Sequence, residues 1–188
     1  MTSIQQQRAV FLDRDGTINV EKEYLYKAED FEFLPGVPEA IKSLKEAGFL
    51  VIVVSNQSGI GRGYFDEKTV ETLHQHIQTK LIEYGTSIDA FYFCPHHPDA
   101  GIGKYKIVCN CRKGAPGMLL QAALEHGINL RRSFMVGDKI ADIEAGERAG
   151  CQSILVRTGY GELTASMPEV QLIQVCSDLS CAARFILE

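Results

Sequence analysis

The sequence lacks the features of membrane, secreted and nucleic-acid-binding proteins. Its net charge is −5, whereas a nucleic-acid binder usually carries a basic excess. No apolar run is long enough to cross a bilayer. The segment Met1 to Arg8 is polar and has no signal-peptide stretch, so we expect a cytoplasmic protein. Structural disulfides are rare in that compartment, and the six cysteines therefore need another explanation.

Length and composition are those of an ordinary globular domain. The chain has 188 residues, of which 45% are hydrophobic and 23% charged. This length suits one hydrophobic core and would be cramped for two, so we predict a single domain over residues 1–188. The sequence shows no internal repeat, low-complexity tract or linker. The small size favours a monomer.

Strand-like and helix-like segments alternate along the chain. Short apolar and β-branched runs predict strands at 9–12, 50–54, 88–93, 133–136 and 153–156. Helical spacing of apolar residues predicts helices around 37–44, 70–81 and 116–127, and another that ends near Gly150. Asp66 is a candidate N-cap, and Gly127 follows the last turn of a helix. Such alternation predicts an α/β fold, a doubly wound and mostly parallel sheet with helices on both faces.

Polar residues stand where three of these strands end. Asp13 follows the first strand, Ser55 the second, and Asp138 the strand at 133–136. Ligands of open parallel sheets bind outside the carboxyl ends of the strands. We therefore expect two carboxylates and a hydroxyl to converge on one crevice.

The segment Asp13-Arg14-Asp15-Gly16-Thr17 carries the most chemical information. A carboxylate can attack phosphorus and form an acyl phosphate, provided that Mg²⁺ held by carboxylates neutralises the phosphate charge. A second acid two residues away can protonate the leaving oxygen and then deprotonate water. Gly16 permits the sharp turn that brings Asp15 over the same site. These five residues alone leave a solvated Asp/Gly turn as the alternative.

Further polar groups support phosphate chemistry. Ser55, Asn56 and Gln57 offer a hydroxyl, amides and main-chain N–H groups suited to phosphoryl oxygens. Lys113 can balance charge on the phosphoryl group, and Asp138 is a candidate magnesium ligand. Asp142, one helical turn later, either holds Lys139 or caps the helix.

Three of the cysteines are grouped with a histidine. Cys94, His96, Cys109 and Cys111 form a set of three thiolates and one imidazole, which suits a closed tetrahedral zinc site in a loop at about 94–113. The spacing C-x-H then C-x-C leaves buried thiols with a surface histidine as the alternative, and His97 competes with His96. The scattered residues Cys151, Cys176 and Cys181 are interpreted as small buried apolar side chains.

The motifs, taken in order, resemble the haloacid dehalogenase superfamily of phosphatases. Asp-x-Asp-Gly-Thr, the serine after the second strand, the lysine and Gly-Asp-x-x-x-Asp extend from Asp13 to Asp142. The resemblance implies a Rossmann-like fold and an Mg²⁺-dependent phosphomonoester hydrolase with an aspartyl-phosphate intermediate. The segments 18–34 and 85–111 are too short for a large cap domain.

A narrower resemblance rests on the run Cys-Pro-His-His-Pro and on the segment 56–63. Both are similar to the heptose bisphosphate phosphatases and to the related histidinol-phosphate phosphatases, and we favour the heptose branch. That branch implies hydrolysis of the C7 phosphate of heptose 1,7-bisphosphate in nucleotide-activated heptose biosynthesis. The alternative is a histidinol-phosphate phosphatase or another small-metabolite phosphatase.

The resemblance also assigns roles to residues. It implies Asp13 as nucleophile, Asp15 as general acid and base, and Mg²⁺ on Asp13, the main-chain carbonyl of Asp15, and Asp138. Zinc falls on His96 rather than His97, which we expect beside the site or in solvent. The implied substrate-binding set, in which Ser55 and Lys113 also support catalysis, is Glu21, Lys22, Glu23, Tyr24, Ser55, Asn56, Gln57, Ser58, Arg112, Lys113 and Lys139. One departure is Gly114, where the family has proline; it makes the pose of Lys113 less fixed.

Other functions fit the sequence less well. A signalling receiver also accepts phosphate on aspartate, but Asp15 is placed to hydrolyse the phosphoaspartate. A zinc-based nucleic-acid module conflicts with the acidic balance. The glycines between Gly59 and Gly63 fail the spacing of a dinucleotide loop. His74 and His76 are expected in solvent on a polar helix face, and His126 at a helix C-terminus.

Overall fold

A six-stranded parallel sheet forms the centre of the molecule. The computed structural model describes residues 7–188. The strands are β1 (Arg8–Leu12), β2 (Phe49–Asn56), β3 (Ala90–Cys94), β4 (Phe134–Gly137), β5 (Gln152–Val156) and β6 (Gln174–Cys176). They lie in the order β3-β2-β1-β4-β5-β6, and the order reverses between β1 and β4. The predicted doubly wound α/β fold is confirmed. The sequence did not predict β6, because a three-residue strand gives too short an apolar run.

Helices follow most of the strands. The longer ones are α1 (Val37–Glu46), α3 (Glu67–Glu83), α4 (Gly117–His126), α5 (Ile140–Ala149) and α7 (Leu179–Leu187). The shorter ones are α2 (Ser58–Gly61), α6 (Gly161–Ala165) and the 3₁₀ turns η1 (Ala28–Asp30), η2 (Gly103–Tyr105), η3 (Leu130–Arg132) and η4 (Pro168–Val170). The Asp66 side chain caps α3 by accepting a hydrogen bond from the Thr69 N–H at 2.8 Å, as predicted. Gly127 ends α4 with a φ of 64°.

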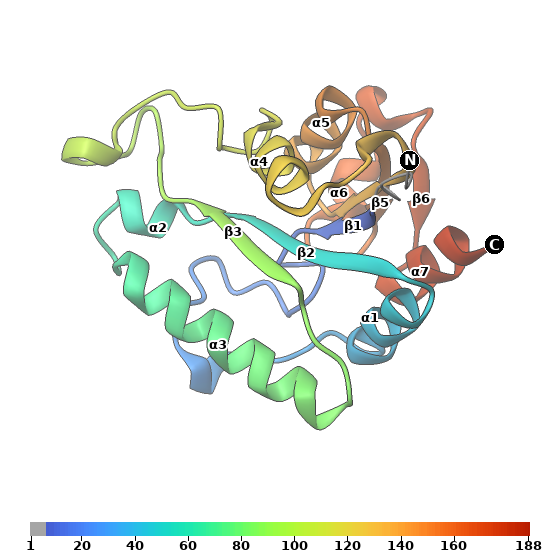
Figure 1. Cartoon of the computed structure of the whole chain (residues 1–188). Helices are drawn as coiled ribbons and strands as arrows, with labels where there is room; N and C mark the ends of the chain where they lie inside the picture. The colour runs from blue at the N-terminus through green and yellow to red at the C-terminus, as the bar shows by residue number, and fades with distance from the viewer. Residues whose placement is uncertain (1–6) are drawn as a thin grey trace, which may run out of the picture.

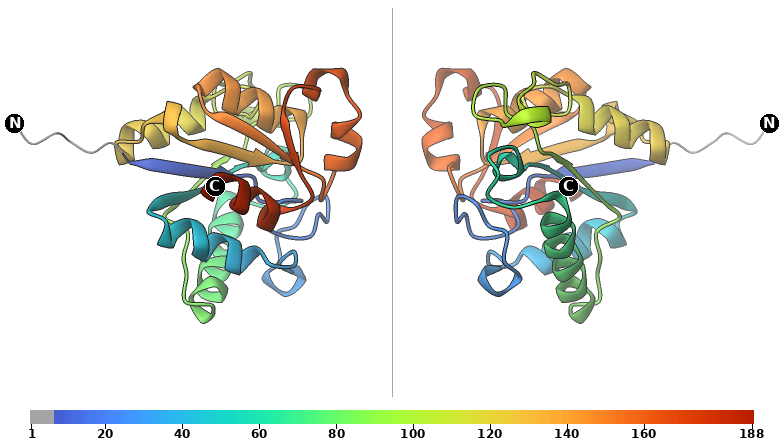
Figure 2. Two further views of the ribbon diagram at one scale, coloured as in Figure 1. Left: turned by 90° about the vertical axis from the view of Figure 1, so that its right-hand side faces the viewer. Right: turned by 90° about the vertical axis from the view of Figure 1, so that its left-hand side faces the viewer.

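The helices cover the two faces of the sheet in separate groups, so the core has two halves. Figure 1 shows α1, α3 and α7 on one face and α4 and α5 on the other. On the first face, Val10 and Val51 pack with apolar residues of α1, α3 and α7. On the second, Phe11 and Ile52 pack with residues of α4 and α5. Both views of Figure 2 show the same sandwich of layers from the side.

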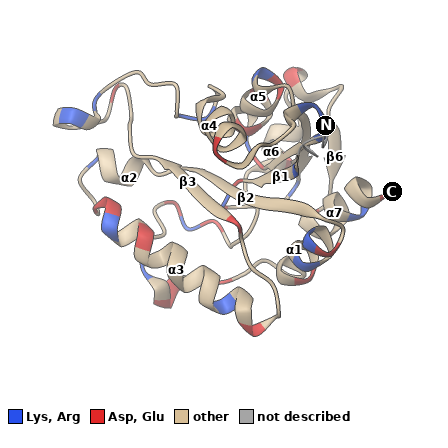
Figure 3. Ribbon diagram, viewed as in Figure 1, with Lys and Arg blue, Asp and Glu red and all other residues tan. Residues whose placement is uncertain are grey.

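Charged residues avoid the sheet. Figure 3 shows them on the helices and loops, and Arg8 is the one charged residue within the six strands. Strands covered on both faces are buried throughout and therefore read as continuous apolar runs. For this reason the positions of β1 to β5 were predictable from the sequence.

Loops, rather than a cap domain, surround the carboxyl ends of the strands. The only helical turn between β1 and α1 is η1, and between β3 and α4 it is η2. Figure 1 shows the segment around η2 extending past the sheet beside α2. It is tied down where the Ile102 N–H donates to the Gly61 carbonyl at 2.8 Å and the Tyr105 hydroxyl donates to Glu67 at 2.8 Å. No helix within residues 7–188 is long and apolar enough to cross a membrane.

The expectation that His74 lies in solvent is wrong. His74 is 5% exposed, and its ring stacks on Phe91 with a centroid distance of 4.5 Å. Burial, with a smaller effect of the Arg14 charge, lowers the pKa of His74 to about 3. The helical pattern failed here because a neutral imidazole can pack as an aromatic ring. His76 is half-buried and meets the edge of Phe31.

Candidate active site

The first three polar residues predicted at strand ends lie at the same edge of the sheet. β1 pairs with β2 on one side and β4 on the other; Asp13 and Asp138 follow β1 and β4, and Ser55 is the last residue but one of β2, which runs two residues further than predicted. The Asp13 N–H donates to the Val136 carbonyl at 2.9 Å, which continues the β1–β4 ladder to Asp13. A cavity of about 40 Å³ opens there and is lined by Asp13, Asp15, Ser55, Asn56, Lys113, Lys139, Ala141 and Asp142.

Lys113 forms a buried charge cluster with two of the carboxylates. Its Nζ lies 2.5 Å from Asp13 Oδ1 and 2.8 Å from Asp142 Oδ1. Burial alone would favour the neutral amine, but the charges of Asp13 and Asp142 outweigh it and raise the pKa of Lys113. The ammonium is therefore charged and adjacent to Asp13. A cation at this position can neutralise an incoming phosphoryl group.

The backbone around Lys113 is well fixed despite the missing proline. The Lys113 N–H donates to Asn56 Oδ1 at 2.8 Å, and the Gly114 N–H donates to the Ala141 carbonyl at 2.9 Å. Gly114 has a φ of 91°, which proline cannot adopt. The chain therefore reaches the same cavity through a left-handed glycine, with contacts to β2 and α5 in place of a fixed ring.

The carboxylates suit a hard divalent cation. Oxygens of Asp13, Asp138 and Asp142 all lie within 4.8 Å of one another. Asp138 Oδ1 is buried and has no hydrogen-bond partner. Burial, and after it the charge of Asp13, raise the pKa of Asp138 to about 8. A buried oxygen without a donor, beside a second carboxylate, fits Mg²⁺, which prefers oxygen ligands.

Asp142 is less available to a metal than Asp138. Its Oδ2 accepts from the Lys139 N–H at 3.0 Å and caps α5, and its Oδ1 faces Lys113. Of the two predicted roles of Asp142, the structure supports the cap. The contact with Lys113 was missed, because residues 113 and 142 are distant in sequence.

Two glycines press against Asp138. A Cβ on Gly16 would lie 2.3 Å from Asp138 Oδ2, and one on Gly159 would lie 2.2 Å from the same atom. Gly16 has a φ of 85°, as expected for the turn after Asp13. The loop after β5 therefore helps to build the carboxylate site, which the sequence motifs did not indicate.

Asp15 is held by a buried arginine. Arg14 Nε donates to Asp15 Oδ1 at 3.1 Å and Nη2 donates to Oδ2 at 2.8 Å. Asn19 adds a donor to Oδ1 at 3.0 Å. Burial opposes ionisation of Asp15, but Arg14 and the other donors outweigh it and lower the pKa of the carboxyl. The Asp15 side chain is thus a carboxylate at the border of the cavity.

A larger cavity of about 490 Å³ adjoins the first. Its lining includes seven predicted substrate-binding residues, Glu21, Glu23, Tyr24, Asn56, Ser58, Arg112 and Lys139, together with Asp15, Ala141 and Tyr160. Lys139 Nζ lies 3.0 Å from Glu21 Oε2. Arg112 donates to the His96 carbonyl at 3.1 Å, so the cysteine loop positions its guanidinium.

The structure places two predicted substrate-binding residues elsewhere. Lys22 donates from Nζ to the Asp30 carbonyl at 2.6 Å and does not line either cavity. Gln57 is 4% exposed and lies behind the cavities. Tyr160 was missed, although it comes shortly after β5 and the strand-end rule could have found it.

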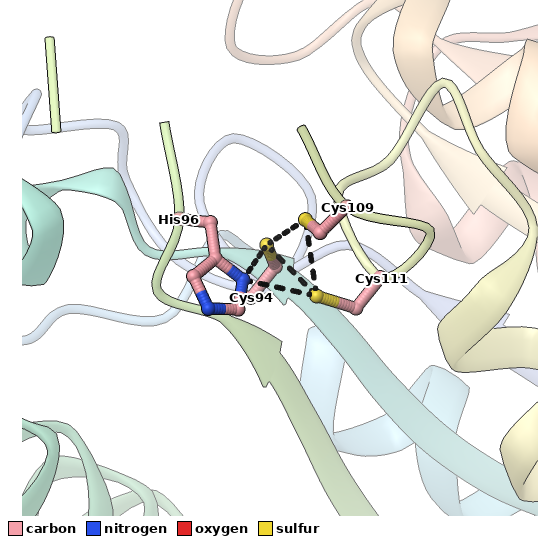
Figure 4. A group of neighbouring side chains, drawn as sticks. All are labelled: Cys94, His96, Cys109 and Cys111. Carbon is pink, nitrogen blue, oxygen red and sulfur yellow. Dashed lines mark hydrogen bonds between the residues drawn. The ribbon is translucent and has the colours of Figure 1, made fainter. Parts of the chain in front are cut away.

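The four soft ligands predicted in the cysteine loop converge, as Figure 4 shows. Cys94 Sγ lies 3.5 Å from Cys109 Sγ and 3.2 Å from Cys111 Sγ, and His96 Nδ1 lies 3.4 Å from Cys111 Sγ. In a tetrahedral zinc site the ligand atoms are about 3.5 to 3.8 Å apart, given the usual bond lengths. The donor set and its spacing therefore fit Zn²⁺ with only a slight expansion.

His97 is outside this cluster. Its Nδ1 accepts from the N–H groups of Asp99 and Ala100 at 3.2 and 3.0 Å. The ring therefore shapes the turn of the loop. Of the scattered cysteines, Cys151 and Cys176 are buried as expected, while Cys181 is half-buried.

Comparisons with known proteins agree with this geometry. A family model described as HAD-hydrolase-like matches residues 110–182. A D-glycero-beta-D-manno-heptose-1,7-bisphosphate 7-phosphatase of Yersinia pestis is 47% identical over 80% of this chain and 81% of its own. One of the same name from Escherichia coli K12 is 46% identical over 80% of each chain. A crystal structure of D,D-heptose 1,7-bisphosphate phosphatase from B. bronchiseptica, complexed with magnesium and phosphate, has a TM-score of 0.84 at 35% identity and covers 96% of this chain and 98% of its own.

The fold and the strand-end carboxylates thus define a haloacid dehalogenase-like hydrolase. Sequence identities of 46 and 47% over four fifths of the chain also identify the branch of this superfamily. The chain belongs to the family of D-glycero-beta-D-manno-heptose-1,7-bisphosphate 7-phosphatases.

Proposed function

We propose that the protein hydrolyses the C7 phosphate of D-glycero-β-D-manno-heptose 1,7-bisphosphate and releases heptose 1-phosphate. The observation that carries this proposal is the pairing of two cavities. The small one is lined by Asp13, Ser55 and Lys113, which suit a phosphoryl group, and the large one beside it carries Arg112 and Lys139. The names of the relatives support the β anomer, which the sequence motifs left open.

The first half-reaction is attack by Asp13 on phosphorus. Both contacts of the Asp13 carboxylate, from the Arg14 N–H at 2.7 Å and from Lys113 at 2.5 Å, are made by Oδ1, so Oδ2 is the attacking oxygen. The new P–O bond gives an aspartyl phosphate as the bond from phosphorus to the C7 oxygen breaks. Lys113 and the Ser55 hydroxyl bind the phosphoryl oxygens. Asp13, Asp138 and the Asp15 carbonyl would hold Mg²⁺, which would supply further neutralisation of the phosphoryl charge.

Asp15 serves both proton transfers. The anionic phosphate opposes ionisation of a nearby carboxyl, so substrate binding favours protonated Asp15, which then donates its proton to the leaving C7 oxygen. The resulting carboxylate takes a proton from water, which attacks the aspartyl phosphate and restores Asp13. The contact with Arg14 favours the ionised carboxylate, which is the state that accepts the proton from water.

Substrate selection falls to the larger cavity. Its positive groups, Arg112 and Lys139, suit the 1-phosphate, and Glu21 suits sugar hydroxyls. Glu23, Tyr24, Asn56 and Ser58 complete the wall. Because no cap domain closes this cavity, a substrate must fill it to exclude water.

The cysteine loop holds Zn²⁺ in a structural role. Four protein ligands leave no position for water. The zinc fixes the loop that carries Arg112, so it acts on substrate binding. We further propose that the enzyme is cytoplasmic and monomeric and acts in nucleotide-activated heptose biosynthesis, as does the branch it resembles.

Phosphate release from a panel of substrates tests this function. The panel holds both anomers of heptose 1,7-bisphosphate, histidinol phosphate and fructose 1,6-bisphosphate, at saturating Mg²⁺. We expect the highest kcat/KM for the β-heptose bisphosphate, with one phosphate released per molecule. A preference for histidinol phosphate would replace the proposal by the histidinol-phosphate branch.

A further inference from the structure

Gln57 sits behind the catalytic cavity rather than in it. Its side chain is 4% exposed, and it is not among the residues that line either cavity. It nevertheless contacts two groups that do line the small cavity, Ser55 and Asp15, and the arginine that holds Asp15. A residue with these contacts can influence the reaction without touching the substrate.

The partners of Gln57 determine which way its amide faces. Nε2 lies 3.2 Å from Asp15 Oδ2, and a carboxylate only accepts hydrogen bonds. Oε1 lies 3.3 Å from Arg14 Nη2, and a guanidinium only donates. The reversed amide would set oxygen against oxygen and N–H against N–H. The orientation is therefore fixed by its neighbours.

This orientation determines the direction of the Ser55 hydroxyl. The second N–H of Gln57 donates to Ser55 Oγ at 2.7 Å, so Oγ accepts on the side of Gln57. Its own proton must then point elsewhere. Ser55 is 1% exposed and borders the small cavity, where the phosphoryl group binds.

We propose that Gln57 is a positioning residue that turns the Ser55 hydroxyl proton toward the phosphoryl group and fixes Asp15 beside it. One amide nitrogen thereby aligns a phosphate donor and the acid/base carboxylate. The proposal rests on phosphoryl transfer at this site, which is part of the proposed function, but it does not depend on which sugar carries the phosphate.

A purely structural glutamine would behave differently. Replacing it would lower stability, and turnover would fall in proportion to the loss of folded protein. Replacing a positioning residue lowers kcat by an amount that depends on the hydrogen-bond donors lost or reversed. The order of kcat among the variants then differs from the order of their stabilities. It also gives coupling to Ser55, which can be measured in a double-mutant cycle.

The decisive variant is Gln57→Glu, which keeps the shape and replaces the donor by an acceptor. Ser55 would then donate to residue 57 and turn its proton away from the cavity. We expect kcat for a generic phosphate ester to fall about 100-fold at saturating Mg²⁺, the usual size for losing one oriented donor. Gln57→Met removes the donors without reversing them, so we expect a loss of about tenfold. This order should hold whatever the order of the melting temperatures.

The cycle with Ser55→Ala tests the link itself. In that background Gln57→Glu should cost at least tenfold less in kcat than it does in the wild type, because no hydroxyl remains to be turned. Full multiplicativity of the two changes, or a Gln57→Glu enzyme within threefold of wild type, overturns the proposal. A wild type that cleaves the generic ester but not heptose bisphosphate would refute the proposed substrate and leave this test intact.

Discussion

The protein has two clusters of side chains that could hold a metal ion, and they are built in opposite ways. The carboxylate cluster draws Asp13 and Asp138 from the segments that follow β1 and β4, and Asp142 from the first turn of α5. The cysteine cluster lies within residues 94–111, in one loop that leaves the edge strand β3. The sheet positions the first cluster and balances part of its charge with Lys113. In the second, Cys94 is fully buried in the hydrophobic core, Cys109 and Cys111 pack against that core, and a bound metal would add stability to the loop.

The comparison indicates that a metal in each cluster would have a different role. The charged carboxylates suit catalysis but lower the stability of the folded protein, because Asp138 has a buried oxygen without a hydrogen-bond donor. Zinc in the cysteine loop would add stability and act on catalysis only through Arg112. Breaking either cluster should therefore give different signatures in turnover and in unfolding.

The largest effect should come from Asp13→Asn. The amide cannot attack phosphorus, so we expect turnover to fall to background while the fold persists, because Lys113 keeps its contact with Asp142. Phosphate release and circular dichroism measure the two parts. Asp99→Asn, on the exposed part of the cysteine loop, is the matched control. A variant within about tenfold of wild type, equal to 1.4 kcal/mol of barrier, would rule out covalent catalysis.

Loss of one zinc ligand should give the opposite signature. Structural zinc contributes about 10 to 16 kcal/mol of binding free energy, part of which folds the loop. Cys109→Ser or Cys111→Ser should therefore lose zinc, lower the melting temperature and raise KM more than they lower kcat. Metal analysis and steady-state kinetics measure this, with Cys181→Ser as the control. Protein purified without chelators that holds no zinc would contradict the assignment.

The pH dependence of the free energy of unfolding should show how much the ionised carboxylate site destabilises the folded protein. The pKa of Asp138 is about 8 in the folded chain, against about 4 for an unfolded aspartate. Between these values the folded state binds more protons, so the stability of the Mg²⁺-free protein should fall by a few kcal/mol as pH rises from about 4 to 8. Mg²⁺ binds the ionised carboxylate and should remove most of this loss.

Urea unfolding at several pH values, after dialysis that removes Mg²⁺ but leaves zinc, measures this effect. Asp138→Asn should flatten the fall and abolish the stabilisation by Mg²⁺. If the variant keeps the full pH slope, another group causes it.

The smallest effect should come from Arg112, which connects the two clusters. Arg112→Ala should reduce kcat/KM for heptose bisphosphate by about 1 to 3 kcal/mol, the usual cost of a lost charge-assisted contact. A small generic ester that does not reach Arg112 should be affected far less. Arg112→Lys should restore the activity only in part, since lysine lacks the planar fork. Equal losses for both esters would place Arg112 outside the substrate site.

The predictability of the two clusters also differs. The cysteine cluster could be predicted from the sequence because its three cysteines and one histidine lie within eighteen residues. The strand-end carboxylates could be predicted from the sequence because buried parallel strands are apolar runs that stop abruptly. By contrast, the partner of Asp142 and the role of Gly159 beside Asp138 depend on contacts with no local pattern.

The sequence by itself determined the α/β fold, the order of the motifs and the residues that end β1, β2 and β4, because periodicity and turn chemistry are local. Only the tertiary structure decided which groups face one another. It buried His74 against Phe91, paired Lys113 with Asp142 and set Gln57 between Ser55 and Asp15. Such contacts join segments that are distant along the chain or reverse the exposure that a helical pattern suggests. They are fixed by packing and by the need to pair buried polar atoms, and no local pattern records either.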